Sequence, residues 1–458
     1  MLFEEAQKYL LSLGHETLTI KLGLENSEKL LTALGNPHKA FPSVQIAGTN
    51  GKGSTAVMLG SICRAAGLRV GLFTSPHLIS ITERIRIDGD EVSDPEFARL
   101  TQTVKETAEA LVREGKLQTL PTFFEHVTAI ALLAFQEANV ELAILETGLG
   151  GRLDSTTAAG AQIVAITPVA MDHQEYLGHT LAEIAAEKAA IVRPGVTAVI
   201  APQNEGALRV IQHRCQEVGV TPILVSDAAV EARTSALSAG PAQYRAQLCN
   251  VLPDGRNCVT FQTPATRYEN VCLGLRGRHQ IANAETAIAL SEALRERGFT
   301  IPDEAILRGL GNARHAGRLE LWDEVVPPIL FDGAHNPAAA RALCNYLDEF
   351  VNRPITMIFG AMRDKALQEM AALLFPAAEN VILTELDNPR AATIDSLQAA
   401  APLHFDQSRI HQARLVADAW RIASQITDAH SMIVVTGSLY LVGAVQEILT
   451  PLSSKFTV

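Results

Sequence analysis

The sequence lacks a long apolar run, an excess of positive charge and a basic start. The stretch 127–135 is among its longest apolar runs, well short of the roughly 18 residues that a membrane span needs. Lys and Arg number 38 against 50 Asp and Glu, a formal net charge of −12. That balance argues against a nucleic-acid coat but allows a local basic pocket for a phosphate. The first five residues, Met-Leu-Phe-Glu-Glu, are acidic, whereas a secretory signal begins with basic residues.

Closely paired cysteines and low-complexity segments are also missing. The six cysteines form no C-x-x-C pair and are scattered over Cys63, Cys215, Cys249, Cys258, Cys272 and Cys344. This spacing predicts reduced thiols and provides no zinc framework. With 47% hydrophobic and 19% charged residues, disordered, collagen-like and coiled-coil chains are excluded. We therefore expect a soluble, cytoplasmic protein, and 458 residues favour two unequal domains.

Short apolar runs alternate with helical stretches along the chain. Residues 1–34 have apolar positions at helical spacing and predict helix. The run 44–47 is followed by a Gly-rich loop, a predicted helix over 54–66 and a predicted strand over 68–73. This order is typical of a parallel α/β sheet. It continues with predicted helices at 123–138, 180–192 and 282–297 and predicted strands at 140–145, 162–167 and 196–201.

The second half of the chain contains a change of pattern. Residues 226–272 are polar and turn-rich and predict a small antiparallel addition to the first unit. The segment 298–302 predicts a hinge, and further strands are expected at 328–332, 355–359, 380–385 and 432–436. We therefore expect an α/β protein in which residues 1–298 form a P-loop-type parallel-sheet domain with this addition. Residues 299–458 are expected to form a Rossmann-like α/β domain.

A candidate phosphate loop lies between the first predicted strand and its helix. It comprises Gly48, Thr49, Asn50, Gly51, Lys52, Gly53, Ser54 and Thr55. Its backbone N–H groups, the helix N-terminus and the charge of Lys52 all favour an anion. The strict Walker pattern fails because Ile46 occupies the first glycine position and Gly53 separates Lys52 from Ser54. An ordinary glycine turn is the alternative, and the strand–loop–helix order favours phosphate binding.

Polar residues follow three of the predicted strands. Ser75, Glu146 and the pair Asp172-His173 come shortly after them. The carboxyl ends of parallel strands share the edge at which ligands bind, so a hydroxyl, a carboxylate and an imidazole there can hold Mg²⁺. The alternatives are a helix-capping role for Glu146 and a core position for His173. Lys188 lies on a mostly apolar helix face and is either a snorkelling lysine or part of this site.

Taken together, these motifs resemble the folylpolyglutamate synthase/dihydrofolate synthase family of the Mur-ligase superfamily. The resemblance is carried by GTNGKGS at 48–54, TSPHL at 74–78, ETGLGGRLD at 146–154 and DGAHN at 332–336, in order along almost the whole chain. It implies an ATP-dependent ligase of folate biosynthesis that adds L-glutamate to folates through an acyl phosphate. It also implies dihydropteroate as a second acceptor.

The resemblance also implies roles for single residues. The Mg²⁺ ligands would be Ser75, Glu146, His173 and Lys188, the last carbamylated, with Lys52, Lys188 and His335 acting in catalysis. ATP would be contacted by the phosphate loop together with Asn283, Arg318 and Asp332. The pterin substrate would be bordered by Leu22, Gly23, Leu24, Phe123, Phe124, Arg152, Leu153 and Asp154. For His335 the alternative is a residue that only orders its loop, and for the two Phe residues it is a core position.

Several alternatives stay open on sequence alone. The enzyme can be a monofunctional folylpolyglutamate synthase or another Mur-type amino-acid ligase, because 315–318 reads His-Ala-Gly-Arg where the family often has Pro-Gly-Arg. A non-catalytic nucleotide switch is disfavoured by the ligand-type residues at the strand ends. A Rossmann oxidoreductase is disfavoured because no G-x-G-x-x-G opens the first βα unit. We expect a monomer with small-molecule substrates and with neither nucleic-acid nor membrane partners.

Overall fold

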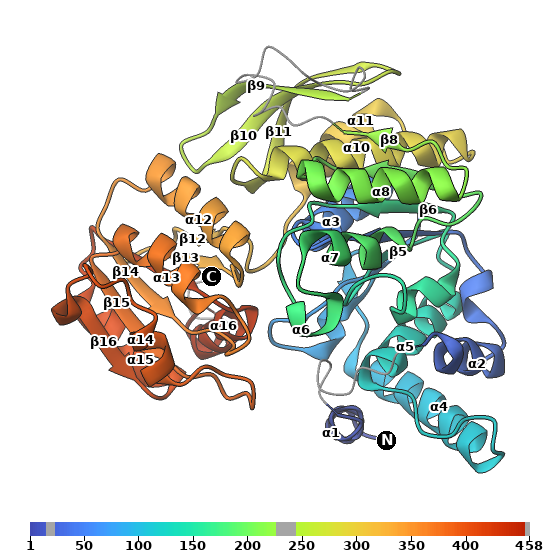
Figure 1. Cartoon of the computed structure of the whole chain (residues 1–458), viewed down its shortest axis with the longest axis horizontal. Coiled ribbons are helices and arrows are strands. Elements are labelled where there is room, and N and C mark those ends of the chain that lie inside the picture. Colours follow the sequence, from blue (N-terminus) through green and yellow to red (C-terminus); the bar gives the residue numbers. More distant parts are fainter. Residues whose placement is uncertain (15–22, 226–243, 454–458) are drawn as a thin grey trace.

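The computed structural model describes residues 1–14, 23–225 and 244–453, and within them the chain forms three β-sheets flanked by helices. Figure 1 shows two lobes, with the C-terminal part in orange and red beside the rest of the chain. The expected α/β class, with two mainly parallel sheets and a small antiparallel one, is confirmed. No helix in the described ranges is both long and apolar enough to cross a membrane.

The largest described sheet has eight strands in the order β4-β3-β2-β5-β1-β6-β7-β8. Their bounds are β1 Ser43–Ala47, β2 Val70–Phe73, β3 Ile85–Ile87, β4 Asp90–Glu91, β5 Leu142–Glu146, β6 Ile163–Ile166, β7 Thr197–Ile200 and β8 Ile223–Leu224. All neighbours run parallel except β2–β3 and β3–β4, which are antiparallel. The carboxyl ends of β2, β5, β1 and β6 therefore lie along one edge, which positions the residues that follow them.

Helices cover both faces of this sheet. Along β5, Leu142 and Ile144 pack on one face and Ala143 and Leu145 on the other, the alternation that a strand imposes. The first face is covered by α3 Lys52–Ala65, α10 Gln280–Glu296 and α11 Asp303–Asn312. The second is covered by α1 Phe3–Ser12, α2 Glu25–Ala33, α4 Asp94–Arg113, α5 Phe123–Glu137, α7 Leu181–Ala189 and α8 Glu205–Glu217. Short helices occupy the loops: η1 Pro37–Lys39, η2 Ile81–Arg84, η3 Ser155–Ala159 and α6 Gln174–Leu177.

The antiparallel addition consists of β9 Arg245–Val251, β10 Arg256–Gln262 and β11 Arg267–Arg276. Residues 226–243 of the predicted segment lie outside the described residues. The expectation of reduced thiols is wrong for two cysteines, because the register of β10 on β11 sets Cys258 opposite Cys272, with Cα atoms 3.9 Å apart, and a disulfide joins them. Fourteen residues separate the two in sequence, so no short motif signalled the pair. The other four cysteines, all in described segments, are free.

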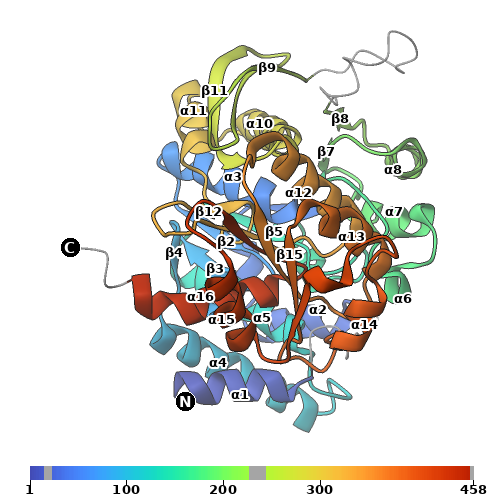
Figure 2. The same ribbon diagram turned by 90° about the vertical axis from the view of Figure 1, so that its left-hand side faces the viewer.

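The C-terminal unit is built on six strands in the order β12-β13-β17-β14-β15-β16 (Figure 2). They are β12 Glu320–Trp322, β13 Ile329–Asp332, β14 Ile355–Phe359, β15 Asn380–Thr384, β16 Ile410–Ala413 and β17 Met432–Thr436. Only β12 runs antiparallel to its neighbour. One face packs on α12 Pro337–Phe350, α13 Leu367–Leu374 and α14 Ile394–Ala399, and the other on α15 Val416–Ile426 and α16 Leu439–Ser453, with η4 Phe375–Ala377 and η5 Gln407–Arg409 in loops.

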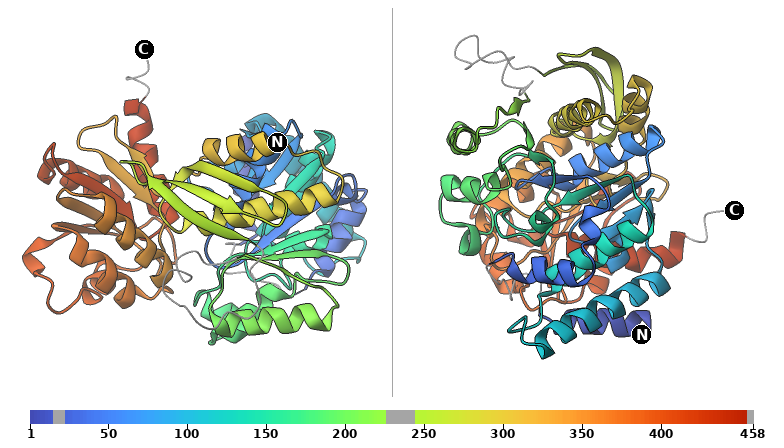
Figure 3. Two further views of the ribbon diagram at one scale, coloured as in Figure 1. Left: turned by 90° about the horizontal axis from the view of Figure 1, so that it is seen from above. Right: turned by 90° about the vertical axis from the view of Figure 1, so that its right-hand side faces the viewer.

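The two units meet through several side chains. The tip of the small sheet reaches α12, where the Tyr346 hydroxyl donates to the Asp254 carbonyl over 2.9 Å; Figure 3 shows this sheet from above. Gly443 of α16 lies so close to the Leu78 backbone that a Cβ there would be 2.0 Å from the Leu78 oxygen. The domain boundary after residue 298 stays a prediction. Both helices that flank 298–302, α10 and α11, pack on α3, so the stretch that leads to the second sheet is 313–319.

Candidate active site

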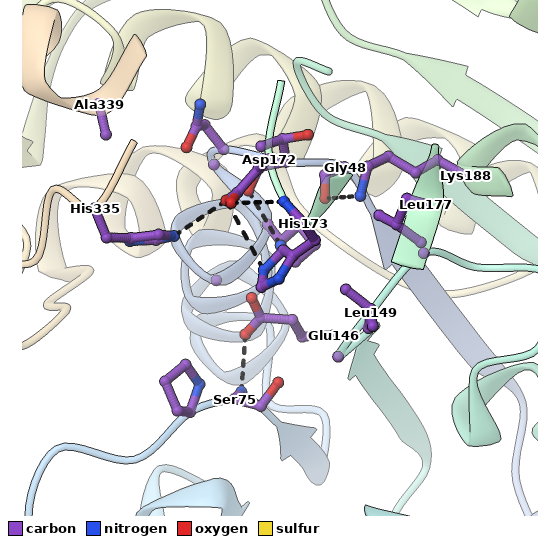
Figure 4. A pocket seen from close by; sticks show the side chains of 18 of the residues that line it. Gly48, Ser75, Glu146, Leu149, Asp172, His173, Leu177, Lys188, His335 and Ala339 are labelled. Atoms are coloured by element: carbon purple, nitrogen blue, oxygen red, sulfur yellow. Dashed lines mark hydrogen bonds and ion pairs between the residues drawn. The ribbon is translucent and has the colours of Figure 1, made fainter. Parts of the chain in front are cut away.

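A cavity of about 760 Å³ opens at the carboxyl edge of the eight-stranded sheet and reaches the C-terminal unit. Most of the predicted site residues line it: Gly23, Gly48, Thr49, Asn50, Gly51, Lys52, Gly53, Ser54, Ser75, Phe124, Glu146, Arg152, Leu153, Asp154, His173, Lys188, Asn283, Arg318, Asp332 and His335. Figure 4 shows the centre of this cavity, where side chains from both units point toward one another. Residues as far apart in sequence as Gly23 and His335 thus share one space.

Three predicted residues do not line the cavity. Thr55 is fully buried beneath the loop. Phe123 is 4% exposed and packs under the Arg84 guanidinium, which lies 5.3 Å from its ring centre. Leu24 precedes α2 as its N-cap residue. Leu22 lies outside the described residues.

The phosphate loop connects β1 to α3. Its first half is held down, because the backbone N–H groups of Thr49 and Asn50 both donate to the Pro168 carbonyl. The first turn of α3 begins at Lys52, and helix geometry leaves its first N–H groups without partners in the helix. Lys52 is desolvated, which lowers its pKa, and its Nζ donates to the Thr49 carbonyl over 3.1 Å. The loop therefore offers a cation and backbone donors to an anion in the cavity.

Glu146, Ser75 and His173 lie at the ends of three strands. Glu146 is 5% exposed, and its carboxylate accepts the Ser75 backbone N–H over 3.1 Å. Burial raises the pKa of Glu146, an effect that the charge of Lys52 opposes. Burial lowers the pKa of His173 to about 3, and its Nδ1 is buried without a hydrogen-bond partner. A buried carboxylate and an unpartnered neutral imidazole nitrogen beside a hydroxyl fit a divalent cation.

The described residues contain no group of three or more His, Cys, Asp or Glu side chains close enough to hold a metal without other ligands. The donor set of Ser75, Glu146 and His173 contains only two residues of those types. A cation there would take further oxygen ligands from the hydroxyl and from nucleotide phosphates, the usual arrangement for Mg²⁺.

Lys188 extends from α7 to the phosphate loop. Its Nζ donates to the Gly48 carbonyl over 2.8 Å, and the residue is 4% exposed. Burial, together with the charge of Lys52, lowers its pKa to about 7. Lys188 is therefore not a snorkelling surface lysine, because its ammonium end is directed inward.

Asp172 is the centre of a network that sequence reasoning did not single out. Its carboxylate pairs with Lys365 Nζ at 2.6 Å, faces His335 Nε2 at 3.5 Å and accepts from Asn336 Nδ2 at 3.3 Å. Burial alone would raise its pKa, but the His335 hydrogen bond and the charges of His173, His335 and Lys365 lower it. Asp172 thus joins the two units inside the cavity. Lys365 was not predicted as a site residue, and the only sequence signal that could have indicated it is its position after the predicted strand 355–359.

The residues of the C-terminal motifs lie across the cavity from the phosphate loop. Asp332 accepts the backbone N–H groups of Leu319 and Ala334, and burial raises its pKa. His335 Nδ1 lies 2.9 Å from the Gly333 carbonyl. From α10, Asn283 Nδ2 donates to Gln280 over 2.9 Å. Both units therefore contribute polar groups to the same space.

The far end of the cavity carries the predicted substrate residues. The Phe124 ring lies 5.8 Å from that of Phe73 and lines the cavity. Arg152 pairs with Glu187, Nη2 to Oε1 over 2.9 Å. Asp154 accepts the backbone N–H of Leu149 over 2.9 Å and is largely committed to ordering its own loop.

Two family models match this chain. Residues 46–291 match the Mur ligase middle domain, and residues 317–439 match the Mur ligase, glutamate ligase domain. Together they span both halves of the cavity described above. The chain is a ligase of the Mur type.

Individual relatives identify the family within that class. Dihydrofolate synthase/folylpolyglutamate synthase of Bacillus subtilis is 35% identical over 440 residues, which cover 95% of this chain and 96% of the relative. The structure of Mycobacterium tuberculosis folylpolyglutamate synthase complexed with ADP superposes with a TM-score of 0.87 at 29% identity and covers 97% and 98% of the two chains. A bifunctional folylpolyglutamate synthase/dihydrofolate synthase with Mn, AMPPNP and L-glutamate bound gives a TM-score of 0.81 at 29% identity, with 98% of each chain covered.

The chain belongs to the dihydrofolate synthase/folylpolyglutamate synthase family and is an ATP-dependent glutamate ligase. The family and the enzyme class predicted from the motifs are confirmed.

Proposed function

We propose that this enzyme ligates L-glutamate both to dihydropteroate and to folates, at the expense of ATP. The observation that supports this most directly is the single cavity that combines a phosphate loop, a buried carboxylate–imidazole pair and the DGAHN residues of the second unit. Such a cavity can hold a nucleotide, an acid and an amine together, which is what an ATP-driven amide ligation requires.

Ser75, Glu146 and His173 are the proposed Mg²⁺ ligands, with Lys188 as a carbamate that bridges to the cation. A bound Mg²⁺ would neutralise charge on the phosphates during transfer. Two observations support a divalent cation at these residues. His173 Nδ1 is buried without a hydrogen-bond partner, and the buried Glu146 carboxylate has a raised pKa in the ligand-free chain. The inward position of Lys188 supports the carbamate, because a lowered pKa leaves more neutral amine to react with CO₂.

The phosphate loop is proposed to align ATP for transfer of its γ-phosphoryl group to the substrate carboxylate. A carboxylate is a poor electrophile, and phosphorylation gives it a leaving group that the amine of L-glutamate can displace. The transfer itself needs mainly alignment and charge neutralisation. Lys52 and the first turn of α3 supply both, because their donors are fixed before the substrate arrives.

The remaining residues are proposed to bind the ends of the substrates. Asn283, Arg318 and Asp332 would contact ATP from both units, and His335 would face the ligation chemistry beside Asp172. Phe124 offers a flat apolar face to a pterin. Gly23, Arg152, Leu153 and Asp154 line the same end of the cavity.

The test is ADP release by purified enzyme with ATP, Mg²⁺ and L-glutamate, and either dihydropteroate or a reduced folate as acceptor. We expect release with both acceptors, and a loss of at least about a hundredfold in Glu146→Gln. Release with the folate alone would establish a monofunctional folylpolyglutamate synthase. Release only with another acid or amino acid would indicate a different Mur-type ligase, and nucleotide binding without any release would favour a switch.

A further inference from the structure

The stretch 313–319, which leads from α11 to the second sheet, places a histidine against the phosphate loop. His315 Nδ1 lies 3.2 Å from the Ser54 hydroxyl, which belongs to the first turn of α3 and lines the cavity. Ser54 is 4% exposed. The sequence showed His315 only as part of a departure from a family motif at 315–318 and gave it no role.

Gly53, which directly precedes Ser54, shows that the loop leaves room for the His315 ring. A Cβ at Gly53 would lie 2.7 Å from His315 Cε1 and 3.2 Å from Glu146 Oε2. The imidazole and the carboxylate therefore occupy the space in which a strict Walker loop carries a hydroxyl side chain directly after its lysine. The glycine at position 53 and the histidine at position 315 therefore go together, because a side chain at position 53 would collide with the His315 ring.

The hydrogen bonds around Ser54 decide what its hydroxyl can do. Gln280 Nε2 donates to Ser54 Oγ over 3.4 Å. Desolvation lowers the pKa of His315 to about 3, and the charges of Arg318 and Arg86 act in the same direction, so the ring is neutral and carries one proton. Nδ1 is the ring nitrogen that faces Ser54 Oγ, at 3.2 Å, so a proton on Nδ1 would point at that oxygen.

We propose that His315 is a positioning residue for the nucleotide: its Nδ1–H donates to Ser54 Oγ and so directs the Ser54 hydroxyl proton into the cavity, toward an ATP phosphate oxygen. With Gln280 and His315 both donating to Ser54 Oγ, its own hydrogen has only the cavity left to point to. His315 lies three residues before Arg318, so the same contact fixes the start of the connection between the units relative to the phosphate loop. This inference rests on the proposed ATP-dependent activity.

The test compares three variants by MgADP affinity and by steady-state kinetics. His315→Leu removes the donor and is expected to weaken MgADP binding and raise the KM for ATP about tenfold, with kcat within about twofold because the contact serves ground and transition states alike. His315→Asn restores a donor at the same position and is expected to remain within about threefold of the wild type. Arg314→Gln, on the neighbouring exposed residue whose contacts are to backbone carbonyls, is the control and should match the wild type.

A double variant distinguishes positioning from a local packing defect. Ser54→Ala is expected to raise the KM for ATP by a similar factor, and adding His315→Leu to it should cause little further loss, because the two residues act through one hydroxyl. Additive losses, an Asn variant as impaired as the Leu variant, or a Leu variant with unchanged MgADP affinity would overturn the inference. A wild-type protein that binds MgADP but ligates nothing would refute the proposed function and leave the binding comparison interpretable.

Discussion

The buried ion pair between Asp172 and Lys365 gives a prediction whose size follows from the structure. Both side chains are almost excluded from solvent, at 6% and 7% exposed, and their charged atoms lie 2.6 Å apart across the two units. Asp172→Asn keeps the shape but leaves the buried Lys365 ammonium with only the Asp364 carboxylate, which is 3.8 Å away and already pairs with Arg390. Removing one partner of a buried pair costs about 3–5 kcal/mol, which corresponds to a fall in melting temperature of roughly 6–20 °C for a unit of 150–250 residues.

Differential scanning calorimetry of the full chain measures this effect. The double variant Asp172→Asn/Lys365→Met should recover most of the loss, because no uncompensated charge remains. Asp418→Asn is the matched control, since Asp418 pairs with Arg421 on the exposed surface of α15 at 3.1 Å, and such pairs contribute at most about 1 kcal/mol. If Asp172→Asn melted within 2 °C of the wild type, or if the double variant were simply additive, the pair would not hold the units together.

Three further predictions concern the phosphate loop, the metal site and acid stability. Lys52→Ala should lower ligation at least about a hundredfold while the circular dichroism spectrum stays unchanged, and near-normal turnover would contradict its phosphate role. Lys188→Ala should slow turnover and recover in part with added formate or acetate, whereas unchanged turnover would exclude a metal-bridging carbamate. His126 is fully buried, and burial lowers its pKa to about 4, so the unfolded chain binds more protons between pH 6.5 and 4 and stability should fall by about 3 kcal/mol as the pH drops through that window. His126→Gln should flatten that part of the stability profile in urea titrations.

Most of the core strands could be predicted from the sequence because they are short, mostly apolar and bounded by turns. The strands at 355–359 and 432–436 were predicted with the bounds that β14 and β17 have. The helix α4 was not predicted, although its apolar positions recur at helical spacing. The antiparallel strands β3 and β4 were missed for a different reason. The edge strand β4 has only two residues, both exposed, so its existence depends on pairing that no local pattern encodes.

In the candidate site, too, some residues could be predicted from the sequence and others could not. Glu146 and His173 could be predicted because Glu146 ends a recognisable strand and His173 follows another one after a short loop, and parallel order alone brings strand ends together. The partnership of Asp172 with Lys365 could not, since 193 residues separate the two and only the packing of one sheet against the other makes them neighbours. His315 was visible merely as a departure from a motif. Its contact with Ser54 depends on the path of a connection that has no secondary structure of its own.

The close contact of Gly443 with the Leu78 backbone limits where the chain can be cut into fragments. The segment that supplies Ser75 is supported by α16, a helix of the C-terminal unit. A fragment that ended before α16 would retain every residue of the anion-binding turn, yet Ser75 would lose its support. Completion of the catalytic centre therefore requires α16 to dock, whichever unit folds first.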